Sequence, residues 1–450
     1  MRKFDLVVLG TGPSGSRVAK GCAEAGWNVA IVESREFGGT CALRGCNPKK
    51  VLVRAAELVD WSRRAEGHLI RSTSPRIDWS ELIAFKNTFT DPVKEKSEAS
   101  FQKRGVATFQ GQGIFLDTNT IAVSDHKLQA DHFVIAVGSR PRSLSVPGED
   151  LVTTSDEFLD LPSLPRRILF VGGGYISFEF AHVARRCDRD VTIITQGDRP
   201  LRAFDEDIVA KLVDHTREIG IEFCAQTKLV SIGRRGESLE VSIEGVDGRR
   251  TIEMDLVVHG AGRIPNLDGM NLSNAEIESS ERGVRVNEFL QSTSNPNVFA
   301  CGDCADSGEM ALTPPANQQG RTIVQNLVAG ELKHLPDYGI VPAAVFTIPS
   351  LASIGLTESE ARSQHMDIDV RTGDMSDWGS VRKVCGSAAS FKLLVDNATD
   401  RIIGAHLFGP HAAETINLFA LAMKFGLTAT DIKSTLFTFP TFSADVRSMI

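Results

Sequence analysis

Cys41 and Cys46 are five positions apart and stand close to two lysines, Lys49 and Lys50. Such a pair can bind zinc, form a structural disulfide or work as a redox couple. The chain has only eight cysteines in 450 residues, which is too few for a disulfide framework. In a reducing compartment a close cysteine pair is more often catalytic or metal-binding than structural, so the residues leave these two interpretations open.

The bulk composition is that of an ordinary globular protein. With 42% hydrophobic and 24% charged residues, the chain can form about two to four domains. The net charge of −8 argues against a nucleic acid or an anionic membrane as the main partner, because both require a clustered basic surface. The N-terminal apolar run leads directly into a glycine turn, and neither a cleavage site nor a long apolar stretch follows. We therefore expect a cytoplasmic, non-membrane protein that acts on small molecules or proteins.

Residues 4–33 predict a strand, a glycine turn, a helix and a second strand that ends in Glu33. In the turn, Gly10, Gly12 and Gly15 match G-x-G-x-x-G, the pattern of a dinucleotide-binding site. The first glycine allows a tight turn, the second lets the backbone approach a pyrophosphate, and the third lets helix and strand pack closely. Glu33 stands where a carboxylate accepts hydrogen bonds from the ribose of the dinucleotide.

A second βαβ pattern covers residues 166–195. Gly172 and Gly174 occupy the first two glycine positions, and Ser177 occupies the third. Because serine is small, we still expect close packing between helix and strand. Two dinucleotide sites in one chain indicate an electron relay, in which one cofactor stays bound and the other visits.

The end of the second pattern bears on the choice of coenzyme. Thr195 stands where an NAD site usually carries an acid, and Arg199 and Arg202 follow in the next loop. Loss of the acid and gain of guanidinium groups suit a ribose 2′-phosphate, which favours NADPH over NADH. The alternative is that both arginines are solvated loop residues, which are common.

The remaining segments complete an α/β architecture. Residues 106–147 alternate like strands that return to the first domain, and residues 221–260 predict further strands. From about residue 340 the pattern changes to strands and helices without a glycine fingerprint, which indicates a third domain. We predict an α/β fold with two Rossmann-like dinucleotide-binding domains and a C-terminal α+β domain, divided as 1–147 with 266–338, 148–265, and 339–450.

Further motifs accompany the two fingerprints and the cysteine pair, namely AVGSRP at 136–141, GAGRIPN at 260–266 and the segment FACGDCADSGEMALTPPANQQGR. With them the chain resembles, over essentially its whole length, the FAD-dependent pyridine nucleotide-disulfide oxidoreductases, the group of glutathione reductase, dihydrolipoamide dehydrogenase and mercuric reductase. The resemblance implies that the first βαβ unit holds FAD, with Gly138 and Asp303 in the cofactor site, and that the second docks the nicotinamide nucleotide. It also implies a homodimer formed through the C-terminal domain.

The resemblance implies a role for each residue near the flavin. Cys46 would contact the flavin, and Cys41 would meet the substrate. Lys49 would lie near flavin N5 and pair with Glu179, because a buried lysine needs a carboxylate partner and its charge stabilises the reduced flavin. Tyr175 would cover the flavin until the nicotinamide displaces it.

The spacing of the cysteine pair fits this chemistry. Residues i and i+5 point about 140° apart on an ideal helix, so a bond between them requires a distorted first turn and is easier to reduce. A helix N-terminus also lowers the pKa of a thiol. No second C-x-x-C or histidine pair lies nearby at ligand spacing, so we expect no metal site, and we interpret Cys301 and Cys304 as buried packing residues.

The C-terminal sequence departs from the family. Thiol–disulfide members end with His-Pro-Thr-x-x-Glu, in which the histidine shuttles a proton to the leaving thiolate. Here Phe439, which cannot transfer a proton, occupies the histidine position, and Ala444 occupies the glutamate position. Asp445 could replace the charge of the glutamate but not an imidazole, and His406 and His411 are interpreted as packing or helix-end residues.

We therefore predict a flavoprotein that passes electrons from NADPH through FAD to the Cys41–Cys46 pair and on to a disulfide or another sulfur acceptor. An alternative is reduction of a metal ion or a quinone, and a third hypothesis is a non-catalytic redox sensor. Retention of the cysteine pair together with Lys49 and Glu179 argues against the sensor. Arg44, between the cysteines, could lower the pKa of Cys41, attract an anionic substrate or be structural.

Overall fold

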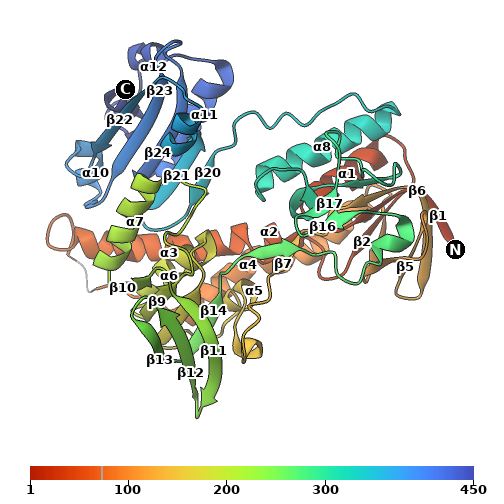
Figure 1. The fold of residues 1–450 in the computed structure, drawn as a ribbon, viewed down its shortest axis with the longest axis horizontal. Helices are drawn as coiled ribbons and strands as arrows, with labels where there is room; N and C mark the ends of the chain where they lie inside the picture. The colour runs from red at the N-terminus through yellow and green to blue at the C-terminus, as the bar shows by residue number, and fades with distance from the viewer. Residues whose placement is uncertain (72–73) are drawn as a thin grey trace. The chain divides into compact units, whose positions relative to one another are not determined.

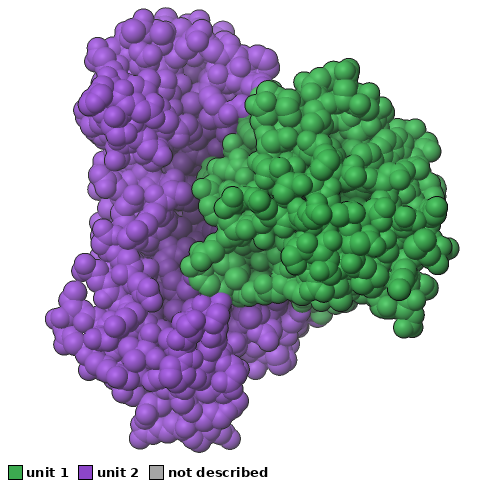
Figure 2. Space-filling view, turned by 45° about the vertical axis from the view of Figure 1, so that its right-hand side comes forward, with its two compact units in different colours: residues 1–49, 85–142, 263–338 green, residues 50–84, 143–262, 339–450 purple. Residues whose placement is uncertain are grey.

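The computed structural model describes residues 1–71 and 74–450. The chain divides into two compact units (Figure 2), which are residues 1–49, 85–142 and 263–338 in unit 1 and residues 50–84, 143–262 and 339–450 in unit 2. Parallel sheets with helices on their faces confirm the predicted α/β fold class. The division into three domains stays a prediction.

Unit 1 contains a central sheet and two small sheets. Its strands are β1 (Arg2–Leu9), β2 (Val29–Glu33), β3 (Ala107–Gln110), β4 (Gly113–Phe115), β5 (Thr120–Val123), β6 (His126–Ile135), β7 (Ser139–Pro141), β15 (Arg263–Pro265), β16 (Ser279–Ser280), β17 (Gly283–Arg285), β18 (Val298–Ala300) and β19 (Ala305–Asp306). Its helices are α1 (Pro13–Glu24), α2 (Gly39–Leu43), η2 (Leu272–Ala275), η3 (Gly302–Cys304) and α8 (Thr313–Ala329). Two long helices, α3 (Cys46–Ala65) and α4 (Trp79–Gln102), contribute residues to both units.

The central sheet of unit 1 has the strand order β3-β2-β1-β6-β5-β4, and β18 pairs with β6. Strand β1 runs parallel to β2 and β6, whereas β4, β5 and β6 form the antiparallel meander predicted within 106–147. Alternate residues of β1 enter two different cores, because successive side chains of a strand point to opposite faces. Val7 packs in one core, and Leu6 and Val8 pack in the other with Val18 of α1 and Ile323 of α8. Helices α1 and α8 therefore cover one face of this sheet (Figure 1).

Gly320, in the middle of α8, lies at the contact between these two helices. A Cβ atom at position 320 would lie 2.8 Å from the backbone oxygen of Ser14, so Gly320 allows α8 to approach α1. Helix α8 starts at Thr313, in the segment that follows Asp303. The sequence motif that contains Asp303 therefore extends into the first turn of α8.

The described residues of unit 2 form three sheets. Its strands are β8 (Arg167–Val171), β9 (Asp190–Ile194), β10 (Ile221–Cys224), β11 (Lys228–Arg235), β12 (Ser238–Gly245), β13 (Gly248–Met254), β14 (Leu256–His259), β20 (Ala343–Val345), β21 (Ser350–Gly355), β22 (Ile368–Asp374), β23 (Ser390–Asp396) and β24 (Ile402–Gly409). Its helices are η1 (Glu149–Leu151), α5 (Ser155–Phe158), α6 (Tyr175–Arg186), α7 (Glu206–Glu218), α9 (Glu358–Ser363), α10 (Gly379–Lys383), α11 (Ala412–Phe425), α12 (Ala429–Ser434) and α13 (Phe442–Met449).

The parallel sheet β10-β9-β8-β14 is the second Rossmann-like sheet. Phe170 of β8 packs with Phe178 of α6 and Leu212 of α7, whereas Leu169 packs with Val241 of the antiparallel sheet β11-β12-β13. The C-terminal sheet β20-β21-β24-β23-β22 is antiparallel throughout and packs on α11 and α13. These sheets confirm a second dinucleotide-binding fold and a C-terminal α+β fold.

Candidate active site

Two glycines of the first fingerprint are required for close packing, and the third leaves open space. Gly10 has φ +105°, and a Cβ atom there would lie 2.3 Å from the backbone oxygen of Ala136. A Cβ atom on Gly15 would lie 2.2 Å from the Gly10 oxygen, so both positions need glycine for packing. A Cβ atom on Gly12 would meet nothing within 4 Å. The open space at Gly12 adjoins the N-terminus of α1, where a pyrophosphate fits.

The carboxylate of Glu33 is held in place at the end of β2. Its Oε2 accepts hydrogen bonds from the Thr11 backbone N–H at 3.0 Å and the Thr11 hydroxyl at 2.5 Å, and its Oε1 accepts one from Arg35 N–H at 3.0 Å. A carboxylate has about four acceptor sites, so it can still accept a ribose hydroxyl. Together with the space at Gly12, this arrangement fits the adenosine half of FAD. Thr11 occupies the first variable position of the fingerprint, between Gly10 and Gly12, and the pattern alone does not mark it as a partner of Glu33.

Three separate sequence motifs meet at Asp303. The Ser139 hydroxyl donates to Asp303 Oδ2 at 2.8 Å, and Arg263 donates from Nε to the same Ser139 oxygen at 3.0 Å. Gln319 Oε1 accepts a hydrogen bond from the Gly302 N–H at 2.6 Å and so holds the turn before Asp303. At Gly138, with φ +67°, an added Cβ atom would meet nothing within 4 Å. These motifs therefore form one polar site around Asp303, and its role in holding the flavin stays a prediction.

The two cysteines lie on different helices. Cys41 belongs to α2, and Cys46 is the first residue of α3, with a break between the helices at Arg44 and Gly45. We expected a distorted first turn within one helix, whereas the structure has two helices with a break between the cysteines. The hydroxyl of Thr313, the first residue of α8, lies 3.4 Å from Cys41 Sγ and 3.8 Å from Cys46 Sγ. Only the folded chain shows that Thr313 belongs to this site.

The two thiols differ in pKa. A hydrogen bond from Cys41 lowers the pKa of Cys46 to about 6 against the opposing effect of burial, and Thr313 and the charge of Lys49 lower it further. The pKa of Cys41, in contrast, is raised by the hydrogen bond to Cys46 and by burial. The reduced pair therefore holds a thiolate at Cys46 and a thiol at Cys41. Cys46 also begins the 20-residue helix α3, whose dipole favours a thiolate there.

Arg44 is tied into the redox loop. Its Nη1 lies 2.7 Å from Glu36 Oε2, its side chain is 11% exposed, and Lys94 Nζ lies 3.4 Å from Glu36 Oε1. This ion pair holds the break between the two cysteine-bearing helices. Of the three roles considered for Arg44, the geometry favours the structural one.

The second dinucleotide turn repeats the first with one change. Gly172 has φ +116°, and an added Cβ atom would lie 2.3 Å from the Gly260 oxygen. Gly174 precedes the first residue of α6, and Ser177 is fully buried against Gly260. The turn therefore provides the tight bend and the close packing expected of a nucleotide site.

The two arginines of the following loop differ in their contacts. Arg199 donates from Nη1 to the Phe204 oxygen and from Nη2 to the Arg202 oxygen, both at 3.2 Å. Arg202 is 68% exposed at its side chain and lies 2.8 Å from Asp198 Oδ1. Arg199 thus braces the loop backbone, and Arg202 is the guanidinium that faces solvent.

Glu179 and Tyr175 both lie on α6. Glu179 is fully buried and accepts a hydrogen bond from the Phe346 N–H at 2.8 Å, while the Lys50 ammonium lies 3.8 Å from the centre of the Phe346 ring. Tyr175 begins α6 and is 44% exposed. The pairing of Glu179 with Lys49 and the covering role of Tyr175 stay predictions.

The C-terminal segment lacks an imidazole at the family's position. Phe439 is 83% exposed, and Asp445, whose pKa is raised by burial, accepts a hydrogen bond from the Ser380 hydroxyl. His406 is buried between the Ser353 hydroxyl and the Leu356 oxygen, at 2.9 and 3.0 Å, which is a packing role. The ring of His411 contacts the ring of Phe442.

Cys301 and Cys304 are both buried, as predicted for packing residues, and burial raises their pKa values. Across residues 1–71 and 74–450, no group of three or more histidine, cysteine or acidic side chains is arranged to hold a metal ion. Within the same residues, no helix has the length and apolar character needed to cross a membrane.

Two dinucleotide cradles, a thiol–thiolate pair and a C-terminal α+β domain define a flavin-dependent disulfide reductase. A model of the pyridine nucleotide-disulphide oxidoreductase family matches residues 4–320, and the dimerisation domain of that family matches residues 341–450. The chain belongs to this family. It is therefore an FAD-containing oxidoreductase of the disulfide-reductase type that uses a pyridine nucleotide.

Named relatives cover almost the whole chain. Glutathione reductase of Burkholderia cepacia is 33% identical over 444 residues, which are 98% of this chain and 97% of that protein. Mercuric reductase of Lysinibacillus sphaericus is 29% identical over 450 residues, covering 99% and 81%. Among solved structures, the Cu(II) complex of the HOCl-induced flavoprotein disulfide reductase RclA from Escherichia coli has a TM-score of 0.89 at 26% identity, covering 100% and 99%.

Proposed function

We propose that this protein is an NADPH-dependent flavoprotein reductase whose Cys41–Cys46 pair delivers electrons to a thiophilic metal ion such as Cu(II) or Hg(II). The observation that carries the proposal is the exposed phenyl ring of Phe439, at the position where disulfide-reducing members of the family carry a proton-shuttling histidine. A leaving thiolate is helped by such a proton, whereas reduction of a metal ion is not.

Different residues of unit 1 bind different parts of FAD. Bound FAD supplies a two-electron carrier between the nicotinamide and the cysteine pair. The Gly12 backbone and the Glu33 carboxylate hold its pyrophosphate and ribose, and Asp303 holds its sugar-alcohol chain. The pairing of Lys49 with Glu179, and Tyr175 as a cover, belong to the same proposal.

The charge state of the cysteine pair suits a metal acceptor. Two sulfur atoms, one of them already a thiolate, match the preference of soft metal ions for sulfur ligands. When the pair closes to a disulfide it releases two electrons, which reduce two Cu(II) ions to Cu(I) or one Hg(II) ion to Hg(0). The Cys41 proton leaves to solvent, so no group at position 439 has to give or take it.

Similar proteins support this acceptor class. Relatives named mercuric reductase align over 99% of the chain, and RclA was solved as a Cu(II) complex. The chain covers 81% of each mercuric reductase and 99% of the RclA chain.

NADPH is the proposed electron donor. Thr195 directly follows β9, at the position where an NAD site carries an acid that binds the ribose. The exposed Arg202 follows in the next loop. A guanidinium binds a 2′-phosphate through charge-assisted hydrogen bonds. We assign Arg202 as the phosphate ligand and Arg199 as the brace of its loop.

A second candidate acceptor is a disulfide or persulfide. The 33% identity to glutathione reductase favours it, because that relative is named for a disulfide substrate. Without the histidine, such an acceptor needs a leaving thiolate of low pKa. Quinone reduction also needs no residue at 439, but no relative reported above is named for it.

The assembly and location are part of the proposal. Residues 341–450 match a dimerisation domain, and on that basis we propose a homodimer. Eight cysteines in 450 residues are too few for a disulfide framework, which suits a cytoplasmic protein.

An acceptor screen tests the function. The FAD-loaded protein is reduced anaerobically with NADPH and mixed separately with Cu(II), Hg(II), glutathione disulfide, a persulfide and a quinone, with Cu(I) trapped by a chromogenic chelator. We expect metal reduction that is lost in Cys41→Ser and Cys46→Ser but kept in the matched control Cys385→Ser. Faster turnover of a disulfide than of either metal ion would overturn the metal assignment in favour of the second candidate.

A further inference from the structure

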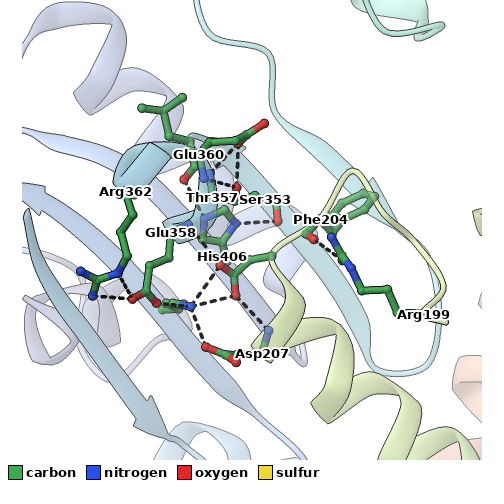
Figure 3. A network of polar contacts seen from close by, with 12 residues as sticks. Arg199, Phe204, Asp207, Ser353, Thr357, Glu358, Glu360, Arg362 and His406 are labelled. Atoms are coloured by element: carbon green, nitrogen blue, oxygen red, sulfur yellow. Dashed lines mark hydrogen bonds and ion pairs between the residues drawn. The ribbon is translucent and has the colours of Figure 1, made fainter. Parts of the chain in front are cut away.

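A network of polar contacts in unit 2 includes Asp207, Glu358 and His406 (Figure 3), and a buried lysine lies between its carboxylates. Lys392 of β23 is 2% exposed, and its Nζ lies 2.6 Å from Asp207 Oδ2, 2.6 Å from Glu358 Oε2 and 3.1 Å from Asp205 Oδ2. Burial alone would lower the pKa of the lysine, but the three carboxylates raise it, so the ammonium is charged. Three carboxylates this close together repel one another unless a cation lies between them.

The same carboxylates hold the beginnings of two helices. Asp205 caps α7 by accepting a hydrogen bond from the Asp207 N–H at 3.2 Å, and it accepts another from the N–H of Glu358, the first residue of α9, at 3.4 Å. Lys392 therefore joins the start of α7, in the nucleotide-binding part of unit 2, to the C-terminal sheet. The position of Asp205 depends on this buried charge.

The loop that carries Arg202 ends at Asp205. At one end the Leu201 N–H donates to the Gly173 oxygen at 2.9 Å, which ties the loop to the glycine turn. Arg199 then closes the loop onto the oxygens of Arg202 and Phe204, and Figure 3 shows its guanidinium directed at Phe204. The next residue is Asp205, so the loop is fastened at the glycine turn and at the Lys392 network.

We propose that Lys392 is a positioning residue for coenzyme selection, which fixes Asp205 and thereby holds Arg202 where a ribose 2′-phosphate binds. The inference rests on the proposed use of NADPH. It assigns to the C-terminal domain a part in recognising a nucleotide that binds to another part of unit 2. A lysine that only stabilised the domain would affect nucleotides with and without the phosphate equally.

Calorimetric titration with 2′,5′-ADP and with 5′-AMP tests this without any electron transfer. Arg202→Met should weaken 2′,5′-ADP binding by roughly 10- to 100-fold, the usual range for a charged hydrogen-bonding partner, and leave 5′-AMP binding unchanged. Lys392→Met should weaken 2′,5′-ADP selectively, by about threefold to tenfold if the guanidinium stays present but is less well placed. Arg362→Gln is the matched control, because it removes a 63% exposed partner of Glu358 and leaves Lys392 in place.

A second variant keeps the test valid if Lys392→Met does not fold. Asp205→Asn preserves a good helix cap but removes the charge that faces Lys392, and it should give the same selective loss. When Asp205→Asn is added to Arg202→Met, 2′,5′-ADP binding should not weaken further, because both substitutions act through the guanidinium of Arg202. Equal losses for both nucleotides, or wild-type binding in both network variants, would overturn the role of Lys392. Unchanged 2′,5′-ADP binding in Arg202→Met would instead refute Arg202 as the phosphate ligand, and equal affinities of the wild type for 2′,5′-ADP and 5′-AMP would refute the NADPH assignment.

Discussion

Ser177 and Gly260 share one space, because a Cβ atom at position 260 would lie only 2.1 Å from the hydroxyl oxygen of Ser177. The first dinucleotide unit has the reverse arrangement, with Gly15 on the helix and Ala136 after the strand. Each pair places one side chain in the helix–strand contact. The side chain of Ser177 at the third fingerprint position therefore occupies the space left by Gly260, some 80 residues away, and the contact stays closely packed.

Gly260→Ala should destabilise the protein. The added methyl group overpacks the contact with Ser177, which costs about 1–3 kcal/mol in the free energy of unfolding. Adding Ser177→Gly should recover most of this loss, measured by urea denaturation. Gly233→Ala is the control, since an added Cβ atom there meets nothing within 4 Å. Equal stability of Gly260→Ala and the wild type would contradict the shared-space argument.

Cys46 should react as a thiolate well below the pH at which an ordinary cysteine does. Its alkylation by iodoacetamide in the reduced protein, followed by mass spectrometry, should be half-maximal near pH 6 and should fall as the pH drops through that value. Thr313→Val removes a hydrogen bond to the thiolate and should move the midpoint upward. A midpoint near that of a free thiol in both proteins would refute the assignment of the thiolate to Cys46.

Glu33→Gln should weaken FAD binding. Two backbone N–H groups and the Thr11 hydroxyl donate hydrogen bonds to this carboxylate. In glutamine one oxygen becomes an NH₂ group, which cannot accept a hydrogen bond from these donors or from the ribose hydroxyl. We expect a loss of about tenfold or more in FAD affinity, measured by fluorescence titration of the apoprotein. Glu24→Gln, at a 62% exposed position of α1, should bind FAD normally. Unchanged affinity in Glu33→Gln would remove this residue from the ribose site.

Restoring the missing dyad should change the choice of acceptor. In Phe439→His with Ala444→Glu, disulfide reduction should rise by up to about 10²-fold, the lower range for general acid catalysis, because the leaving thiolate gains a proton donor. Metal-ion reduction should stay the same, since it needs no such group. Steady-state rates with glutathione disulfide and Cu(II) provide the comparison. If disulfide reduction does not increase, the lost dyad is not what limits that reaction.

Local spacing alone determined much of this protein. The fingerprints at Gly10 and Gly172 specify strand, turn and helix over short distances, because a tight turn and a backbone–phosphate approach restrict which residues can stand there. For the same reason Glu33 could be assigned in advance to the end of its strand. The replacement of histidine by Phe439 was likewise visible in the sequence, since it concerns the chemistry of a single side chain.

Contacts between distant segments were decided by the tertiary structure. Thr313, the first residue of α8, lies at the sulfur atoms of Cys41 and Cys46. Lys392 of the C-terminal sheet meets Asp205 at the start of α7. The break at Arg44 and Gly45 also appears only after folding, when Arg44 meets Glu36. Spacing along the chain describes neighbours within a turn or a strand, whereas a buried charge or a shared volume is defined by whichever segment folds against it.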